Sequence, residues 1–345
     1  MELRGAHRSE RDEVLDLLAR WYDNREFFAR YNLNDPAFRD ELCLVARDGG
    51  HLVSTAQIFD RKVILGSQAV PMGGIGSVYT LEPHRKRGTA SGLMRLAVKT
   101  LEHEGFEMSL LFAERLNFYA GFGWRSITRV FTVIHGAPRI PAATALRIER
   151  FDSARDLRQV AAIYEAYSGR FDSTAVRDLA YWRGNLRYAG NPDEYFVVAR
   201  VADGAIGAYA RAIEYYGFAM VMEYGYRPEA IEAMLALFRH LAAARLPRAY
   251  ALDTNRRADQ MAAQVVAPAE SVSLVTHSIH DSVLEERLGA AGCSLGHHED
   301  NYYMWRVILP QRLSRRFDKP PELAAARALA MVQDRGSLYW TADRF

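Results

Sequence analysis

The chain has 345 residues, of which 49% are apolar and 25% charged, and its formal net charge is +2 at neutral pH. This length exceeds one ordinary core and suits two domains. The small net charge predicts no general attraction to nucleic acid, and no apolar run is long enough to span a membrane. Residues 1–4 lack the apolar core of a signal peptide, and Cys43 and Cys293 stand far apart, so we expect free thiols and a cytoplasmic location.

The first part of the chain alternates helical and strand patterns. Spacing and turn residues predict a helix over 9–30, strands over 42–47 and 52–59 around a turn at 48–50, a strand over 75–81, a helix over 90–104 and a strand over 108–112. The last three elements form a βαβ unit. We therefore expect its two strands to be parallel neighbours in one sheet.

The second part repeats this plan, which indicates two tandem modules. Its expected elements are strands over 146–148, 195–202, 205–216, 219–224 and 248–252 and helices over 157–167 and 228–244. The fold class is α+β with mixed sheets, divided into residues 1–140, 141–308 and a tail, 309–345, that contains one short Ala-rich helix.

The segment Arg85-Lys86-Arg87-Gly88-Thr89-Ala90 lies between a predicted strand and a predicted helix. A loop in this place turns backbone N–H groups and the helix N-terminus toward one point, where they can hold a pyrophosphate. Gly88 permits a close approach, and the arginines add charge-assisted contacts. The alternative is a solvated basic turn before an ordinary helix.

The pattern R-x-x-G-x-A after a strand, followed after the next strand by Phe118-Tyr119-Ala120-Gly121-Phe122-Gly123-Trp124, resembles the GNAT superfamily of N-acetyltransferases. The stretch from Gly73 to Val78, read together with the two motifs, is similar to the "enhanced intracellular survival" (Eis) branch, which carries tandem GNAT modules. The specific motifs lie between residues 73 and 124. The connector at 81–84 is one residue shorter than is usual in the family. The residues assigned to the strand could therefore shift by one position along the chain.

The resemblance implies an acetyl-CoA cosubstrate and direct attack by an amine on its thioester. The residues that it assigns to the cofactor are Val78, Tyr79 and Thr80 on the strand and Arg85, Lys86, Arg87, Gly88, Thr89 and Ala90 in the loop. A backbone N–H of the strand would stabilise the oxyanion. Tyr119 occupies the position of the general acid, and its phenol can protonate the leaving thiolate. The alternative for Tyr119 is simple packing within its aromatic segment.

Two candidates remain for the general base. In the Eis branch the C-terminal carboxylate takes part, and this chain ends in Trp340-Thr341-Ala342-Asp343-Arg344-Phe345. The third domain of that branch is absent or reduced to the tail, so Phe345 would reach the site by another path. The alternative is that Trp340 and Phe345 pack on a surface between the modules. Glu114 is the second candidate for the base, and the alternative is that it is a solvated carboxylate without a catalytic role.

The second module lacks the features of a cofactor loop. Its corresponding segment has Pro228, which removes a donor, and Glu229, which places negative charge where pyrophosphate would lie. Both residues suit a helix start. We therefore expect a scaffold without a CoA site.

Two further clusters carry weaker hypotheses. Gly296-His297-His298-Glu299-Asp300 has no accompanying ligand set at zinc spacing, so we expect no metal. The aromatic and acidic residues Trp21, Tyr22, Asp23, Glu26 and Phe27 lie near the GNAT acceptor helix and could hold a cationic amine, although a mixed helix face is the commoner explanation.

The sequence thus predicts an acetyl-CoA-dependent N-acetyltransferase that acts on a primary amine of a small molecule or peptide. Nucleic acid and membrane partners are not expected, and a homo-oligomer is left open. The rival hypotheses are an aminoacyl-tRNA-dependent aminoacyltransferase and a non-catalytic acyl-CoA sensor. The first would need a broad basic surface, and the second would not depend on Tyr119. The acceptor is left open among aminoglycosides, polyamines, peptide lysines and biosynthetic intermediates.

Overall fold

The computed structural model describes residues 1–22, 25–143, 145–188, 194–215, 218–247, 272–277, 281–334 and 336–343. The chain forms two compact units, each with its own core. The first contains residues 1–128 and 301–334, and the second contains residues 129–300 and the segment that ends the described chain. The sequence pattern predicted a boundary after residue 140 and a separate tail over 309–345. The units divide the chain differently because two long strands, β6 (Arg125–His135) and β12 (Ser294–Val307), each contribute residues to both.

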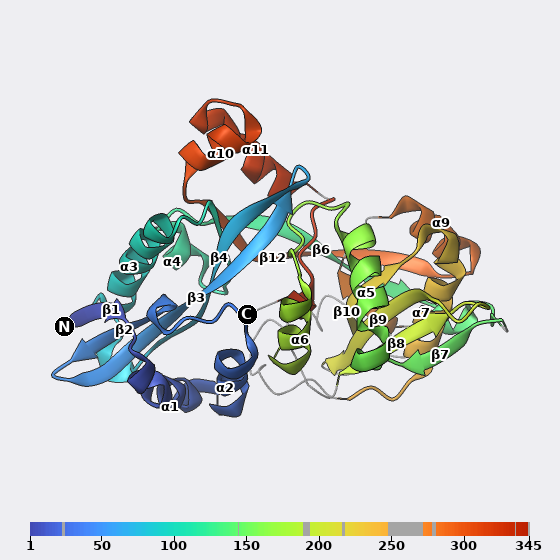
Figure 1. Ribbon diagram of the computed structural model, residues 1–345, viewed down its shortest axis with the longest axis horizontal. Coiled ribbons are helices and arrows are strands. Elements are labelled where there is room, and N and C mark those ends of the chain that lie inside the picture. Colours follow the sequence, from blue (N-terminus) through green and yellow to red (C-terminus); the bar gives the residue numbers. More distant parts are fainter. Residues whose placement is uncertain are drawn as a thin grey trace. The chain divides into compact units, whose positions relative to one another are not determined.

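The first unit is a mixed sheet with helices on both faces (Figure 1). Its strand order is β1-β2-β3-β4-β5-β12, and the only parallel neighbours among its described strands are β4 and β5. The elements are β1 (Glu2–Gly5), α1 (Arg11–Tyr22), α2 (Arg25–Asn34), β2 (Cys43–Asp48), β3 (His51–Leu65), β4 (Gln68–Thr80), α3 (Thr89–Glu104), β5 (Met108–Phe112), α4 (Leu116–Ala120), α10 (Pro310–Phe317) and α11 (Pro321–Gln333).

Strand alternation divides the first unit's side chains between two layers. Ala56 and Ile58 of β3 belong to the buried cluster that includes α3. The alternating residues Thr55, Gln57 and Phe59 lie on the other face, with α1 and α2. Gly105 ends α3 in the left-handed conformation (φ 83°), as its sequence position suggests. The predicted βαβ unit and its parallel strand pair are confirmed.

The second unit repeats the element order of the first within the described residues. Its strand order is β6-β11-β10-β9-β8-β7, with β10 and β11 parallel. The elements are β7 (Arg147–Arg150), α5 (Ser153–Ser168), α6 (Leu179–Tyr188), β8 (Tyr195–Arg200), β9 (Ile206–Tyr215), β10 (Phe218–Tyr226), α7 (Ile231–Ala243), β11 (Val272–His277) and α9 (Ser282–Ala290). In chain order, β1 to β6 and β7 to β12 both follow the pattern β-α-α-β-β-β-α-β-α-β. The last strand of each series lies in the sheet of the other unit, because β12 pairs with β5 and β6 pairs with β11.

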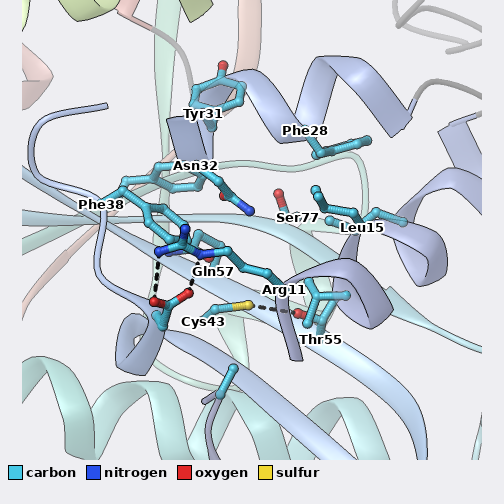
Figure 2. Close-up of a pocket in the computed structure, with 15 residues that line it drawn as sticks. Arg11, Leu15, Phe28, Tyr31, Asn32, Phe38, Cys43, Thr55, Gln57 and Ser77 are labelled. Carbon is cyan, nitrogen blue, oxygen red and sulfur yellow. Dashed lines mark hydrogen bonds and ion pairs between the residues drawn. The ribbon is translucent and has the colours of Figure 1, made fainter. Parts of the chain in front are cut away.

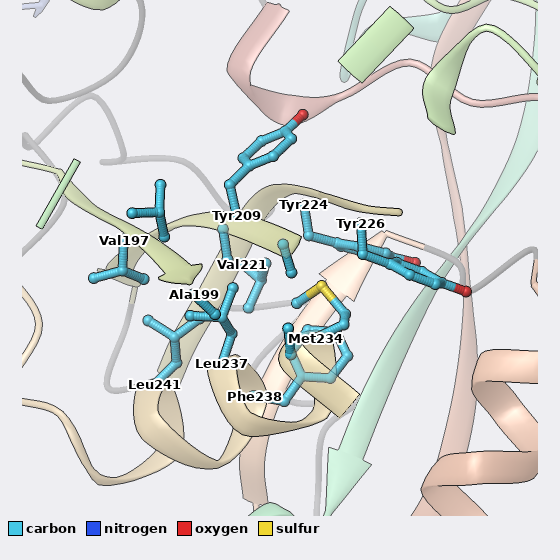
Figure 3. Close-up of a cluster of buried hydrophobic side chains, with 14 of the residues drawn as sticks. Val197, Ala199, Tyr209, Val221, Tyr224, Tyr226, Met234, Leu237, Phe238 and Leu241 are labelled. Atoms are coloured by element: carbon cyan, nitrogen blue, oxygen red, sulfur yellow. The ribbon is translucent and has the colours of Figure 1, made fainter. Parts of the chain in front are cut away.

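Part of the core of the second unit lies between its sheet and α7 (Figure 3), and residues of α5 and α6 belong to the same buried cluster. Met234, Leu237, Phe238 and Leu241 of α7 cover the sheet. The helix begins after a 3-10 turn over Pro228–Ala230. On α5, the Asp152 side chain caps the helix by accepting hydrogen bonds from the backbone N–H groups of Ala154 and Arg155.

Several sequence-based expectations differ from the structure. The helix expected over 9–30 is two helices, α1 and α2, and the strand expected from 75 begins at Gln68 after a hairpin turn. The tail contains two helices, α10 and α11, instead of the one predicted, and α10 was missed because it has only eight residues, most of them polar or charged. The tail beyond α11 enters the core of the second unit, where Trp340 is fully buried rather than on a surface. The strand expected over 248–252 lies outside the described residues.

Candidate active site

The end of β4 provides the first part of the site. β4 pairs with β5 from Met72 opposite Met108 to Ile75 opposite Leu111, but it continues to Thr80. The register between β3 and β4 shifts in the same stretch, and Ser77 there adopts a left-handed backbone conformation (φ 51°). Such a bulge bends a strand away from its ladder. β4 therefore has a bulge just beyond its last pair with β5, at the strand end that carries the residues predicted to bind the cofactor.

The loop from β4 to α3 has the geometry expected of an anion site. Gly88 precedes the first residue of α3 with φ 82°, and an added Cβ would meet no heavy atom within 4 Å. Lys86 (φ 59°), Arg87 and Gly88 are exposed, whereas Thr89 is buried and its hydroxyl donates to the carbonyl of His84 at 3.3 Å. The N–H groups of the first helical turn have no partners within their own helix. Backbone donors and two cations thus meet at one exposed helix start.

Arg85 connects this loop to the end of β4. Its Nε donates to the carbonyl oxygen of Thr80 at 2.9 Å, and its guanidinium lies 5.6 Å from the centre of the Tyr79 ring. The buried hydroxyl of Ser54 on β3 forms hydrogen bonds with the carbonyl of Tyr79 at 2.7 Å and the hydroxyl of Thr80 at 2.6 Å. Arg85 therefore braces the strand end in addition to any contact with phosphate. Sequence reasoning missed Ser54, because a serine inside a strand carries no motif.

Tyr119 and Glu114, the candidates after β5, have different surroundings. Tyr119 is half-buried on α4, where its ring packs edge-on against Phe118 at a centroid distance of 5.0 Å. It packs against the same apolar cluster as Val78 of β4, which places both residues on the α3 face of the sheet. Glu114 is exposed. The third candidate, Phe345, lies outside the described residues.

A second feature of the first unit is a pocket on the opposite face of the sheet, beneath α1 and α2 (Figure 2). Ser77 lies at this pocket, whereas the next residue, Val78, packs on the α3 face. The bulge of β4 therefore contributes a side chain to each face of the sheet. The lining residues are Ala6, Arg11, Val14, Leu15, Leu18, Phe28, Tyr31, Asn32, Phe38, Asp40, Cys43, Thr55, Gln57, Phe59 and Ser77. Sequence reasoning did not find it, because its walls come from five separate stretches of chain.

Of the five residues that could hold a cationic amine, the structure describes the side chains of Glu26 and Phe27. Phe27 is buried, and Glu26 is bound to Arg30 at 3.0 Å. Asp23 and the side chains of Trp21 and Tyr22 lie outside what the structure describes.

The corresponding place in the second unit is filled by protein. The parallel register of β10 with β11 ends at Val221 opposite Thr276, and β10 continues to Tyr226, as in the first unit. However, Tyr224 is buried against Trp340 at a ring distance of 5.0 Å. Helix α7 has no glycine at its start and is preceded by the 3-10 turn that begins at Pro228.

The histidines near the start of β12 make contacts of their own in the second unit. His298 stacks on Phe131 at 5.1 Å, and burial lowers the pKa of His298, with His135 and His297 adding to the effect. Nδ1 of His297 lies 3.1 Å from the hydroxyl of Thr132. Over the ranges that the structure describes, no three His, Cys, Asp or Glu side chains converge as metal ligands. No helix in those ranges is long and apolar enough to cross a membrane.

These features define a βαβ unit with a glycine at a helix start and a bulged strand end, in a chain that repeats the element order but not the glycine. Residues 2–127 match the family model described as "Acetyltransferase (GNAT) domain". This part of the chain is therefore a GNAT acetyltransferase domain, as the sequence motifs indicated.

Known proteins support this assignment. An uncharacterized N-acetyltransferase of Streptomyces griseus is 27% identical over an alignment of 177 residues that covers 47% of this chain and 42% of that protein. The match thus spans less than half the length of this curated relative. The crystal structure of Eis1 from Mycobacterium abscessus shares the fold, with a TM-score of 0.55, 16% identity and coverage of 89% of this chain and 74% of that one. A Saccharomyces cerevisiae N-myristoyltransferase with bound myristoyl-CoA also shares it, with a TM-score of 0.52, 13% identity and coverage of 89% and 79%.

Proposed function

We propose that the protein is an acetyl-CoA-dependent N-acetyltransferase that acetylates a primary amine of a small molecule or peptide. The observation that carries the proposal is the strand end of β4 joined to the helix start at Gly88, within a matched GNAT domain. A fold neighbour holds myristoyl-CoA, which supports an acyl-CoA as the cosubstrate.

In this proposal the pyrophosphate lies at residues 85–90, where backbone N–H groups and the exposed Lys86 and Arg87 face it. The pantetheine arm follows Val78, Tyr79 and Thr80 along the end of β4 beyond its bulge. A backbone N–H of this strand stabilises the oxyanion that forms when the amine attacks the thioester. The new C–N bond forms as the C–S bond breaks, and CoA leaves as the thiolate.

Two proton transfers complete the reaction. Tyr119 donates its phenolic proton to the leaving thiolate. The attacking ammonium first loses a proton to a base, for which the C-terminal carboxylate of Phe345 and the exposed Glu114 are the candidates. The chain's own groups thus supply acid and base, and no covalent acyl-enzyme is formed.

Acetyl-CoA titration by calorimetry tests the cofactor site. The parent protein should bind one acetyl-CoA per chain, because the second unit has Pro228 and Glu229 in place of a glycine loop. Gly88→Glu should abolish binding. The Cβ position is open, so the loss would come from charge repulsion, a blocked helix start and an unfavourable φ rather than from a clash.

Gly204→Glu is the matched control, because Gly204 has nearly the same φ (84°) and equally open space in a turn of the second unit. It should keep the parental affinity. Parental affinity in the Gly88 variant would reject the cofactor site, and two sites per chain would reject the assignment of the second unit as a scaffold.

A further inference from the structure

The second unit has an open groove beside the C-terminal half of α7. The described residues that line it come from the connection before β7, from β7 and β8, and from α7 with the two residues that follow the helix. Its cavity volume is about 410 Å³, within the range of roughly 300–1,000 Å³ that is usual for small-molecule sites. The turn at Pro228, which replaces the glycine loop, lies at the opposite end of α7. The groove is therefore separate from the degenerate cofactor position of this unit.

The walls of the groove are largely apolar and aromatic. Leu146, Ile148 and Ala236 line it with aliphatic side chains. The rings of Tyr195 and His240 are stacked with their centroids 5.8 Å apart, and the Tyr195 hydroxyl lies 2.9 Å from Nε2 of His240. Burial lowers the pKa of His240, which favours the neutral imidazole in this pair. A flat apolar body placed against these side chains would be removed from water.

Two arginines line the same groove, and none of the described lining residues is a carboxylate. Neither Arg239 nor Arg245 forms an ion pair with a described residue. Arg155, Arg200 and Arg211 of the same unit, in contrast, each lie within 2.8 Å of a carboxylate oxygen. Basic side chains near a helix C-terminus also complement the helix dipole, but that role requires no cavity beside them. The groove thus combines apolar walls with two cations that have no counter-ion among the described side chains.

We propose that this groove is a second ligand site, which binds a small organic anion with an aromatic or aliphatic body, such as an aryl carboxylate. Arg239 and Arg245 hold the anionic group by charge-assisted hydrogen bonds, and the apolar walls with Tyr195 cover the body. A cationic ligand is excluded by the same two guanidinium groups. The site is independent of the proposed transferase function, because it uses residues of the second unit and none of residues 78–90.

Calorimetric titration with 2-naphthoate and 2-naphthamide at low ionic strength tests the charge requirement, because the two probes share one flat ring system and differ in charge. We expect the carboxylate to bind about tenfold more tightly than the amide or better, since charge-assisted hydrogen bonds are the stronger kind. Equal affinities, or tighter binding of the amide, would overturn the proposal.

A double variant, Arg239→Gln with Arg245→Gln, connects the probe to the groove. It should weaken 2-naphthoate about tenfold or more and leave 2-naphthamide near its parental affinity, which also shows that the groove is intact. The matched control is Arg158→Gln with Arg183→Gln, which removes the same charge from exposed positions of α5 and α6 outside the groove. An equal loss in the control pair would mean that only net charge matters, and the proposal would be wrong.

A filling variant tests the contact with the apolar body. Ala243 lines the groove and is exposed on α7, so Ala243→Trp occupies the cavity without entering the core. Both probes should bind about tenfold more weakly or worse, because the ring takes the place of the ligand. Ala154→Trp, at an exposed position of α5 outside the groove, should leave both affinities unchanged. Parental affinities in Ala243→Trp would place the probes elsewhere and reject the groove.

Two more measurements identify other occupants. Gly88→Glu, which disrupts the proposed cofactor loop, should keep the parental affinity for 2-naphthoate. Loss of that affinity would place the probe at the cofactor loop and overturn the proposal. Sedimentation of the parent and of the arginine double variant tests whether a second copy covers the groove. If the parent is an oligomer that the double variant dissociates, and 2-naphthoate does not bind the parent, the groove is an interface between copies and the proposal is wrong.

Discussion

The guanidinium of Arg177 and the carboxylate of Asp343 form a fully buried, bidentate ion pair in the second unit, with nitrogen to oxygen distances of 2.8 and 2.6 Å across 166 residues of sequence. Arg177 also binds Glu223 of β10 at 2.7 and 3.0 Å. The hydroxyl of Tyr181 donates to Asp343 at 3.0 Å. The last described residues are thus part of the interior charge network of the second unit.

Neighbouring contacts hold the same segment. The indole N–H of Trp340 donates to the hydroxyl of Ser168 at 2.9 Å, and the amide of Asn185 donates to the carbonyl of Ala342 at 2.8 Å. Buried polar groups cost free energy unless they are hydrogen-bonded. Removal of one partner from this network should therefore lower the free energy of unfolding of the second unit.

We expect Asp343→Asn to destabilise the second unit by about 3 kcal/mol, the lower end of the cost of breaking a buried pair, since Arg177 would retain Glu223. Denaturant unfolding followed by fluorescence of Trp340 and Trp182 would measure the change. Asp318→Asn, an exposed aspartate at the end of α10 with φ 50°, is the control and should change stability little. Equal stabilities of the two variants would show that the tail pair contributes nothing.

The second unit should lose stability in acid through Glu223. Burial opposes its charged form, but Arg177 and Arg211 outweigh burial and hold the pKa of Glu223 below its ordinary value. A depressed native pKa contributes stability above the unfolded-state pKa, near 4.3, and this contribution is lost as the pH falls through the native value. Unfolding free energies measured from pH 7 to pH 3 should therefore decline.

Glu223→Gln separates this contribution from the rest of the acid response. The variant should be less stable at pH 7 and show a shallower decline, because its amide does not titrate. An acid limb as steep as that of the parent protein would assign the decline to other carboxylates.

Tyr119→Phe tests the proposed general acid. The ring packing against Phe118 is kept and only the hydroxyl is deleted, so acetyl-CoA affinity should stay near the parental value. The loss of an acid–base group should lower kcat by about 10²- to 10⁴-fold. Phe118→Leu is a useful comparison, because it alters the packing and retains the hydroxyl. A Tyr119→Phe rate within twofold of the parent would leave Tyr119 with a packing role.

Extension of the chain by two glycines after Phe345 tests the C-terminal carboxylate as base. The extension moves the carboxylate and leaves every side chain in place, so kcat should fall if the terminal carboxylate takes the proton. Glu114→Gln should then have little effect. The reverse result, a parental rate for the extended protein and a large loss in Glu114→Gln, would assign the base to Glu114.

The sequence by itself determined the βαβ unit of the first domain. Its strand, helix and strand had distinct periods, and the glycines at 88 and 105 marked the two ends of α3. Both glycines adopt positive φ values in the structure. The same local signals indicated the repeated element order and the absence of a glycine loop before α7. These features depend on residues close together in the chain, so the pattern of one segment contained them.

The tertiary structure alone decided where distant segments meet. It paired β12 with β5 and β6 with β11, brought Ser54 to the end of β4 and assembled the pocket at Ser77 from α1, α2 and three strands. It also placed Trp340 and Asp343 inside the second unit, where the sequence had indicated only a tail. Strand pairing, pocket walls and buried ion pairs depend on contacts between residues far apart in the chain, and no local periodicity encodes which of the possible partners a strand or a charge will meet.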